Sequence, residues 1–155
     1  TIYRASPLHD IGKVGIPDHI LLKPGSLNDE EWQVMKRHTE IGAQTLDAVL
    51  QRYPHADYLR VGRDIAWAHH ERWDGSGYPR GLKQLEIPLC ARIVSLADVY
   101  DALTMKRVYK AAMSHEVARG IILEMEGKQF DPMVVRAFRQ LEPQFLEIKE
   151  SYQES

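Results

Sequence analysis

The stretch LCARIVSLADVYDALT, residues 89–104, decides the fold of this chain. Its apolar side chains recur at helical spacing, which predicts a helix buried among other helices. These side chains are Leu89, Ile93, Leu96, Ala97, Tyr100 and Leu103. Asp98 places a carboxylate within the same run, and a buried charge is costly unless it is paired or bound to a metal ion. The stretch therefore predicts a helical bundle with a polar site in its core.

Capping residues mark several other helices. Asn28, followed by Glu31, predicts a capping box and a helix over about 29–37. Ser114 predicts a cap for a helix that follows it, and Asp131-Pro132 predicts a cap with proline in the first turn. Strand patterns are nearly absent, so the expected class is all-α.

The segments between these helices divide into two further helices and two loops. Helices are expected over 40–52 and 58–72, whereas the glycines and prolines of 11–27 and 74–88 predict long loops. Pro143 is expected to break or kink the last helix. We therefore expect one domain over residues 1–142, followed by a C-terminal helical tail over 143–155.

Composition excludes several classes of protein. The 155 residues carry a formal net charge of −2, which argues against binding to a nucleic-acid polymer. No run of eighteen apolar residues is present, so no membrane insertion is expected. Cys90 is the only cysteine, so no internal disulfide forms, and we expect a reducing, cytoplasmic location. The start at Thr1 predicts that the chain begins inside a longer gene product.

Histidines and carboxylates are the candidates for chemistry. His9-Asp10 and His69-His70 are adjacent pairs on predicted helices, where neighbours project about 100° apart. Such neighbours are poorly placed to share one tetrahedral ion but can each reach a different ion of a two-metal cluster. A mixed histidine and carboxylate set suits zinc, iron or manganese. Lone histidines on helices are more often capping or solvated residues, and this is our interpretation of His19, His55 and His115.

Two long motifs carry a family resemblance. Residues 8–18, LHDIGKVGIPD, and residues 69–79, HHERWDGSGYP, resemble the two signature blocks of HD-GYP domains. Met35-Lys36-Arg37-His38 and the stretch 87–104 match further blocks in the same order. The similarity runs from about residue 7 to 140. It implies an HD-domain-like helical bundle, with long loops around a metal site in the bundle core.

The resemblance implies a role for each matching residue. The implied metal ligands are His9, Asp10, His38, His69, His70 and Asp98. Lys13 matches the lysine that contacts the scissile phosphate, and Asp10 and Lys13 are the implied catalytic residues. The remaining implied substrate-binding residues are Arg107, Tyr109 and Lys110 in one segment, and Gly77, Tyr78 and Pro79 in the loop beside the active site.

The implied activity is metal-dependent hydrolysis of cyclic di-GMP to pGpG, GMP or both. Two divalent ions would hold a bridging hydroxide that attacks phosphorus. Iron or manganese is expected, and zinc or nickel is also compatible with these ligands. The ions and Lys13 would stabilise the negative charge that grows on the phosphoryl oxygens. The implied partners are diguanylate cyclase (GGDEF) proteins, through the Gly-Tyr-Pro loop, and an upstream receiver or sensor domain.

One departure from the family leaves alternatives open. The family has further ligands on an upstream helix, and the eight residues before His9 include neither histidine nor glutamate. We therefore expect partial metal occupancy and an uncovered apolar face that favours a homodimer. Two alternatives stand beside the phosphodiesterase: an impaired HD-GYP module that binds nucleotide or signalling proteins, and an HD-type hydrolase of other nucleotides.

Overall fold

The computed structural model describes residues 1–105 and 112–153. Within these ranges the regular structure is helical, apart from an isolated bridge between Glu126 and Phe130, which confirms the all-α class. The helices are α1 (Ile2–Ala5), α2 (Asp18–Leu21), α3 (Asp29–Lys36), α4 (His38–Arg52), α5 (Asp57–Ala68), α6 (Leu89–Thr104), α7 (His115–Glu124), α8 (Pro132–Gln140) and α9 (Glu142–Gln153). Short 3₁₀ helices cover Ser6–Leu8, Ile11–Gly15 and Gln84–Glu86. None of the helices in the described ranges is long and apolar enough to cross a membrane.

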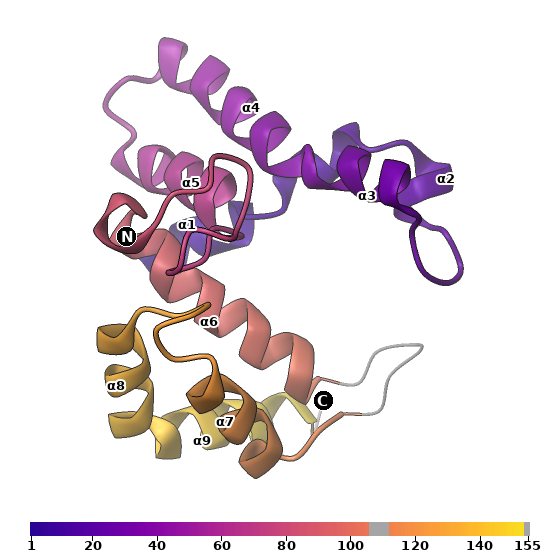
Figure 1. The fold of residues 1–155 in the computed structure, drawn as a ribbon. Coiled ribbons are helices and arrows are strands. Elements are labelled where there is room, and N and C mark those ends of the chain that lie inside the picture. Colours follow the sequence, from indigo (N-terminus) through magenta and orange to yellow (C-terminus); the bar gives the residue numbers. More distant parts are fainter. Residues whose placement is uncertain (106–111, 154–155) are drawn as a thin grey trace.

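Helix α6 joins the two halves of the molecule (Figure 1). Towards its start, Val94 packs with Ala5 of α1 and Ile65 of α5. Towards its end it belongs to a second cluster with α7 and α8, made of Leu96, Tyr100, Ala118, Ile122, Phe130, Val135 and Phe138. A helix that packs on opposite sides needs apolar residues around most of its circumference, which is the pattern seen in the sequence. The predicted burial is wrong for Leu89, which is 55% exposed because α6 begins at the surface, and for Ala97, which is also exposed.

The caps form as expected. The Asn28 side chain accepts from the Glu31 backbone N–H while the Glu31 carboxylate accepts from the Asn28 N–H, a complete capping box. Ser114 caps α7 by accepting from the Val117 N–H, and Asp131 caps α8 by accepting from the Met133 N–H. Helix α8 ends at Gln140, and Pro143 lies in the first turn of α9, where a missing backbone N–H costs nothing.

Two of the expected boundaries differ. The 11–27 segment is not only loop, because η2 (Ile11–Gly15) and α2 interrupt it and bury Ile16 and Ile20. Helix α5 ends at Ala68 rather than near residue 72, and the chain turns there with the Glu71 N–H bonded to the Ala68 carbonyl. Both differences place the histidine pairs in turns at the ends of helical segments.

Helices α4 and α5 lie side by side in the upper part of Figure 1 and fix the site geometry. They approach closely because Gly42 faces Ala66, where an added Cβ would lie 3.3 Å from the alanine methyl group. This packing brings the start of α4 beside the end of α5. His38 and His69 occupy those two positions.

Candidate metal centre

The His9-Asp10 turn is held against the start of α4 by Gly12. A Cβ at Gly12 would lie 1.9 Å from the His38 carbonyl oxygen and 2.4 Å from the Gly42 nitrogen. Only glycine allows this approach without moving the backbone. The glycine that follows the His-Asp pair therefore brings that pair to His38.

Three histidines present the same face to one another. The Nδ1 atoms of His9, His38 and His69 lie 2.8, 2.8 and 3.0 Å from the backbone carbonyl oxygens of Ser6, Met35 and Ile65. A carbonyl oxygen only accepts hydrogen bonds, so each Nδ1 carries a proton, and in the neutral imidazole Nε2 keeps its lone pair. This is the state in which imidazole binds a metal ion through Nε2.

Asp10 lies between two groups of ligand atoms. The first group comes from His9 and Asp98, and the second from His38 and His69. The Oδ2 of Asp10 is 3.3 Å from the Nε2 of His9, whose Nε2 is also 3.7 Å from the Oδ1 of Asp98. Its Oδ1 is 3.5 Å from the Nε2 of His38 and 3.9 Å from the Nε2 of His69. One carboxylate oxygen thus faces each group.

His70 completes the second group. One ligand atom from each of His38, His69 and His70 lies within 4.8 Å of the others. The rings of His69 and His70 are 4.0 Å apart. The prediction that the histidine pairs lie on helices is wrong, because His9-Asp10 and His69-His70 occupy turns. Adjacent histidines in a turn are free of the 100° helical spacing, so His69 and His70 can approach a common ion.

The protonation states suit metal binding. Burial lowers the pKa of His38, of His69 to about 4, and of His70 to about 2. Burial alone would raise the pKa of Asp10, but hydrogen bonds from His9 and Lys13 outweigh it and hold that pKa below its usual range. A hydrogen bond with Asp10 raises the pKa of His9. At neutral pH the second group therefore offers neutral imidazoles beside an ionised carboxylate.

A second observation indicates that these residues can hold a metal ion. The Nε2 atoms of His38 and His69 have no hydrogen-bonding partner, and water cannot supply one because the two residues are only 2% and 1% exposed. Leaving a buried polar atom unpaired costs about 1–3 kcal/mol. Two such atoms that point toward the same carboxylate are what a metal ligand set requires.

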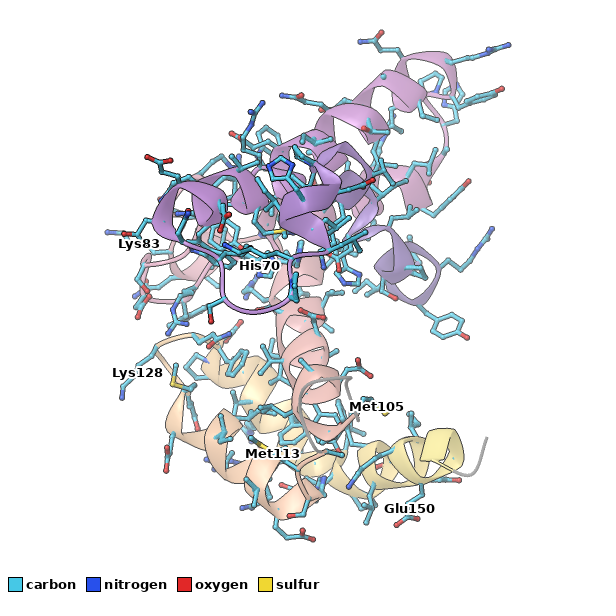
Figure 2. The ribbon with its side chains drawn as sticks, turned by 90° about the vertical axis from the view of Figure 1, so that its right-hand side faces the viewer. His70, Lys83, Met105, Met113, Lys128 and Glu150 are labelled. Carbon is cyan, nitrogen blue, oxygen red and sulfur yellow. The ribbon has the colours of Figure 1, made fainter. Side chains whose placement is uncertain are left out.

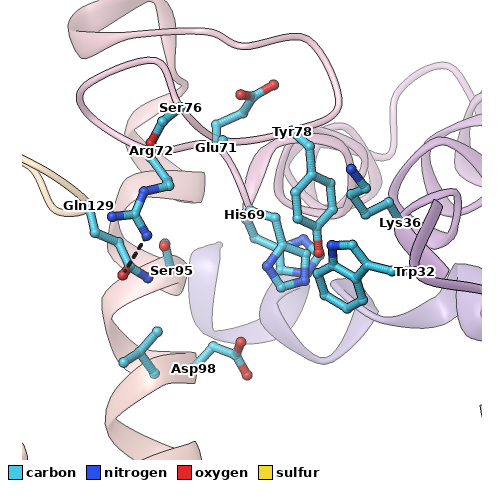
Figure 3. Close-up of a pocket in the computed structure, with 13 residues that line it drawn as sticks. Trp32, Lys36, His69, Glu71, Arg72, Ser76, Tyr78, Ser95, Asp98 and Gln129 are labelled. Atoms are coloured by element: carbon cyan, nitrogen blue, oxygen red, sulfur yellow. Dashed lines mark hydrogen bonds between the residues drawn. The ribbon is translucent and has the colours of Figure 1, made fainter. Parts of the chain in front are cut away.

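A pocket of about 390 Å³ opens beside this cluster (Figure 3). His69, His70 and Asp98 line it, together with Gly77 and Tyr78 of the predicted substrate loop. The Tyr78 ring stacks on His70 with 4.8 Å between ring centroids. Burial raises the pKa of the Tyr78 hydroxyl, so the phenol stays protonated. Pro79 follows through a cis peptide bond.

The loop is folded around Glu71. This carboxylate is 2% exposed and accepts the backbone N–H groups of Arg80 at 2.8 Å and Leu82 at 3.0 Å. At the other side, a Cβ on Gly77 would lie 2.4 Å from the Arg72 nitrogen and 2.5 Å from the His70 carbonyl oxygen. The loop therefore returns directly onto the His70-Glu71 backbone, which places Tyr78 over the histidines.

The remaining predicted residues divide into one that joins the site and three that are not placed. The Lys13 ammonium donates to Asp10 Oδ2 at 2.6 Å. Arg107, Tyr109 and Lys110 lie outside the described residues. Figure 2 shows the flanking Met105 at the end of α6 away from His70.

Sequence reasoning missed two features of the pocket. Trp32 and Lys36 of α3 line it, and their spacing of four residues on a helix was the available signal. Glu71 is part of the 69–79 motif, but the sequence predicted no role for it. Its position directly after two candidate ligands gives no hint that it would turn back to hold the loop.

Comparison with known proteins places this geometry in a family. The HD domain model matches residues 1–134. A cyclic di-GMP phosphodiesterase of Vibrio cholerae serotype O1 is 50% identical over 154 residues, which is 99% of this chain and 31% of the relative. The cyclic di-GMP phosphodiesterase response regulator RpfG of Xanthomonas campestris pv. campestris is 49% identical over 136 residues, 88% of this chain and 35% of the relative.

A third relative is named for a different substrate. The 3′3′-cGAMP-specific phosphodiesterase 2 of Vibrio cholerae is 43% identical over 150 residues, 97% of this chain and 28% of the relative. The chain spans about a third of the length of these curated relatives. The match over residues 1–134, together with the histidine and aspartate cluster at the ends of α4, α5 and the His9-Asp10 turn, shows that the chain belongs to the HD domain family.

Proposed function

We propose that this chain is a metal-dependent phosphodiesterase domain that hydrolyses cyclic di-GMP to pGpG, GMP or both. The observation that carries the proposal is the convergence of three Nε2 atoms on one carboxylate, with two of those atoms buried and unpartnered. The proposed substrate is that of relatives named as cyclic di-GMP phosphodiesterases, which match nearly the whole of this chain.

The proposed ligands form two groups that share Asp10. His38, His69 and His70 would hold one ion, and His9 and Asp98 the other, with one Asp10 oxygen directed to each. Iron or manganese suits this donor set, and zinc or nickel is compatible with it. When bound, the ions supply a nucleophile at neutral pH and offset the charge of the phosphodiester.

The chain's own residues would orient the substrate. Lys13 lies 41% exposed at the edge of the cluster, so its ammonium can leave Asp10 for a phosphoryl oxygen. Tyr78 keeps its proton, and Figure 3 shows its hydroxyl directed toward the imidazoles, where it can donate to a bound phosphate. Arg107, Tyr109 and Lys110 stay proposed substrate-binding residues.

A second candidate substrate is 3′3′-cGAMP, which the name of a 43% identical relative favours. The two dinucleotides differ in one purine base and share the phosphodiester ring. A competition assay with equal amounts of both, followed by chromatography of the products, tests the proposal. Preferential loss of cyclic di-GMP with appearance of pGpG or GMP supports it, whereas preferential loss of 3′3′-cGAMP reassigns the substrate.

The partner proposals concern surfaces around the same domain. We propose that diguanylate cyclase proteins bind at the Gly-Tyr-Pro loop, that a receiver or sensor domain lies upstream, and that the domain forms a homodimer. The response-regulator name of one relative supports the receiver. The division into a domain over 1–142 and a tail over 143–155 is likewise a proposal.

A further inference from the structure

Helix α3 presents two side chains to the pocket that take no part in the histidine and carboxylate cluster. Trp32 and Lys36 are four residues apart, so they lie on the same face of the helix. Both line the pocket with His69, His70 and Tyr78. Figure 3 shows them together on the side of the pocket where Tyr78 stands, across from Arg72 and Gln129.

The Trp32 indole is open to a ligand. It is 44% exposed, although it lies beside a buried polar cluster rather than on an open helix surface. It meets the Tyr78 ring edge to face, with 6.1 Å between ring centroids and 80° between the planes. An edge contact of this kind leaves an indole face free for stacking.

An aromatic series leads from the cluster to this indole. His70 and Tyr78 are stacked at 4.8 Å, and Tyr78 in turn meets Trp32. The Lys36 ammonium lies 5.6 Å from the Tyr78 ring centroid, which adds a positive charge to the same wall. A phosphodiester at the histidines would therefore have an aromatic surface and a cation next to it.

We propose that Trp32 is a base-stacking platform, which binds one purine of the nucleotide substrate while Lys36 provides positive charge for its phosphates. This inference rests on the proposed function, because it supposes that the pocket receives a nucleotide. Nucleobases stack on aromatic side chains with little preference among bases. Trp32 therefore contributes affinity for a purine nucleotide and does not distinguish guanine from adenine.

The test separates the base from the phosphate. Binding of GMP and of ribose 5-phosphate to the metal-loaded protein is measured by calorimetry for wild type, Trp32→Leu and Trp32→Phe. Loss of a stacked base weakens binding by about tenfold. We expect Trp32→Leu to weaken GMP by that factor and to leave ribose 5-phosphate unchanged, whereas Trp32→Phe retains most GMP affinity. Tyr53→Leu, at an aromatic that is 55% exposed away from the pocket, should match wild type.

Two results would overturn the inference: GMP affinity that is unchanged in Trp32→Leu, or equal weakening of GMP and ribose 5-phosphate, which would mean that Trp32 only supports the fold. Cyclic di-GMP turnover by the same wild-type sample decides the proposed function separately. Wild type that binds GMP through Trp32 without turning over cyclic di-GMP would leave the platform standing and remove the proposed reaction. Turnover of cyclic di-GMP by wild type, with GMP affinity unchanged in Trp32→Leu, would remove the platform and leave the proposed reaction standing.

Discussion

At the scale of single residues, the site depends on where each imidazole sends its proton. His9, His38 and His69 all direct Nδ1 to a backbone carbonyl three or four residues earlier. The same local contact recurs in three separate segments, and each time it turns Nε2 toward Asp10. Asp10 is thus the residue on which both proposed ion positions depend.

Replacing Asp10 by Asn keeps the shape of the side chain and removes its charge. We expect Asp10→Asn to lower the metal content and to reduce phosphodiester hydrolysis by at least about a hundredfold, because even an indirect support of a metal ligand is worth about 10–100-fold. Elemental analysis and turnover measure both. His55→Ala, at an exposed histidine outside the cluster, is the control. Full metal content and full turnover in Asp10→Asn would contradict the proposed bridge.

The buried imidazoles also predict how stability depends on pH. In the folded protein the pKa of His69 is about 4 and that of His70 about 2, whereas an unfolded histidine titrates near 6.5. Between these values the unfolded chain binds more protons, so the free energy of unfolding falls as the pH is lowered from about 6.5 toward 4. His9 opposes this trend because its pKa is raised, but it is one residue against three.

Denaturant unfolding of the metal-free protein at several pH values between 4.5 and 7.5 measures this slope. We expect a shallower slope in His70→Gln, because that variant removes one of the depressed groups. A free energy of unfolding that is constant over the range would show that the histidines are solvated and freely protonated in the folded state.

At the scale of elements, the reactive residues occupy the ends of helices and the turns between them. Asp98 is the member of the proposed set that lies within a long helix, α6. The sequence predicted α6 with its observed limits and the caps of α3, α7 and α8, because these signals are local. It misplaced the end of α5, since the turn at His69 depends on the loop that Glu71 and Gly77 hold from further along the chain.

The close return of that loop makes Gly77 the sharpest test at this scale. We expect Gly77→Ala to lower the free energy of unfolding by about 1–3 kcal/mol, as overpacking does, and to reduce turnover by moving Tyr78 away from His70. Gly120→Ala is the matched control, because a Cβ there meets nothing within 4 Å. In α7 it should be neutral or stabilise by up to about 1 kcal/mol. Equal behaviour of the two variants in unfolding and turnover assays would contradict the account of the loop.

At the scale of the whole molecule, α6 ties two packed halves together, and the histidines of the cluster come from the half that contains α4 and α5. The motifs predicted a set of metal ligands, and the structure brings the six predicted residues His9, Asp10, His38, His69, His70 and Asp98 together. They did not predict the α3 wall of Trp32 and Lys36, because that wall depends on how α3 packs beside the Gly-Tyr-Pro loop.

The central claim is that this cluster is a metal-dependent phosphodiesterase site. Its most direct test is metal content by elemental analysis on anaerobically purified protein, with cyclic di-GMP turnover assayed on the same sample before and after chelation. The account predicts at most two ions per chain, and turnover that stops when the metal is removed by chelation and returns when metal is added. Protein that carries its full metal content yet leaves cyclic di-GMP intact, or turnover that survives complete removal of metal, would contradict it.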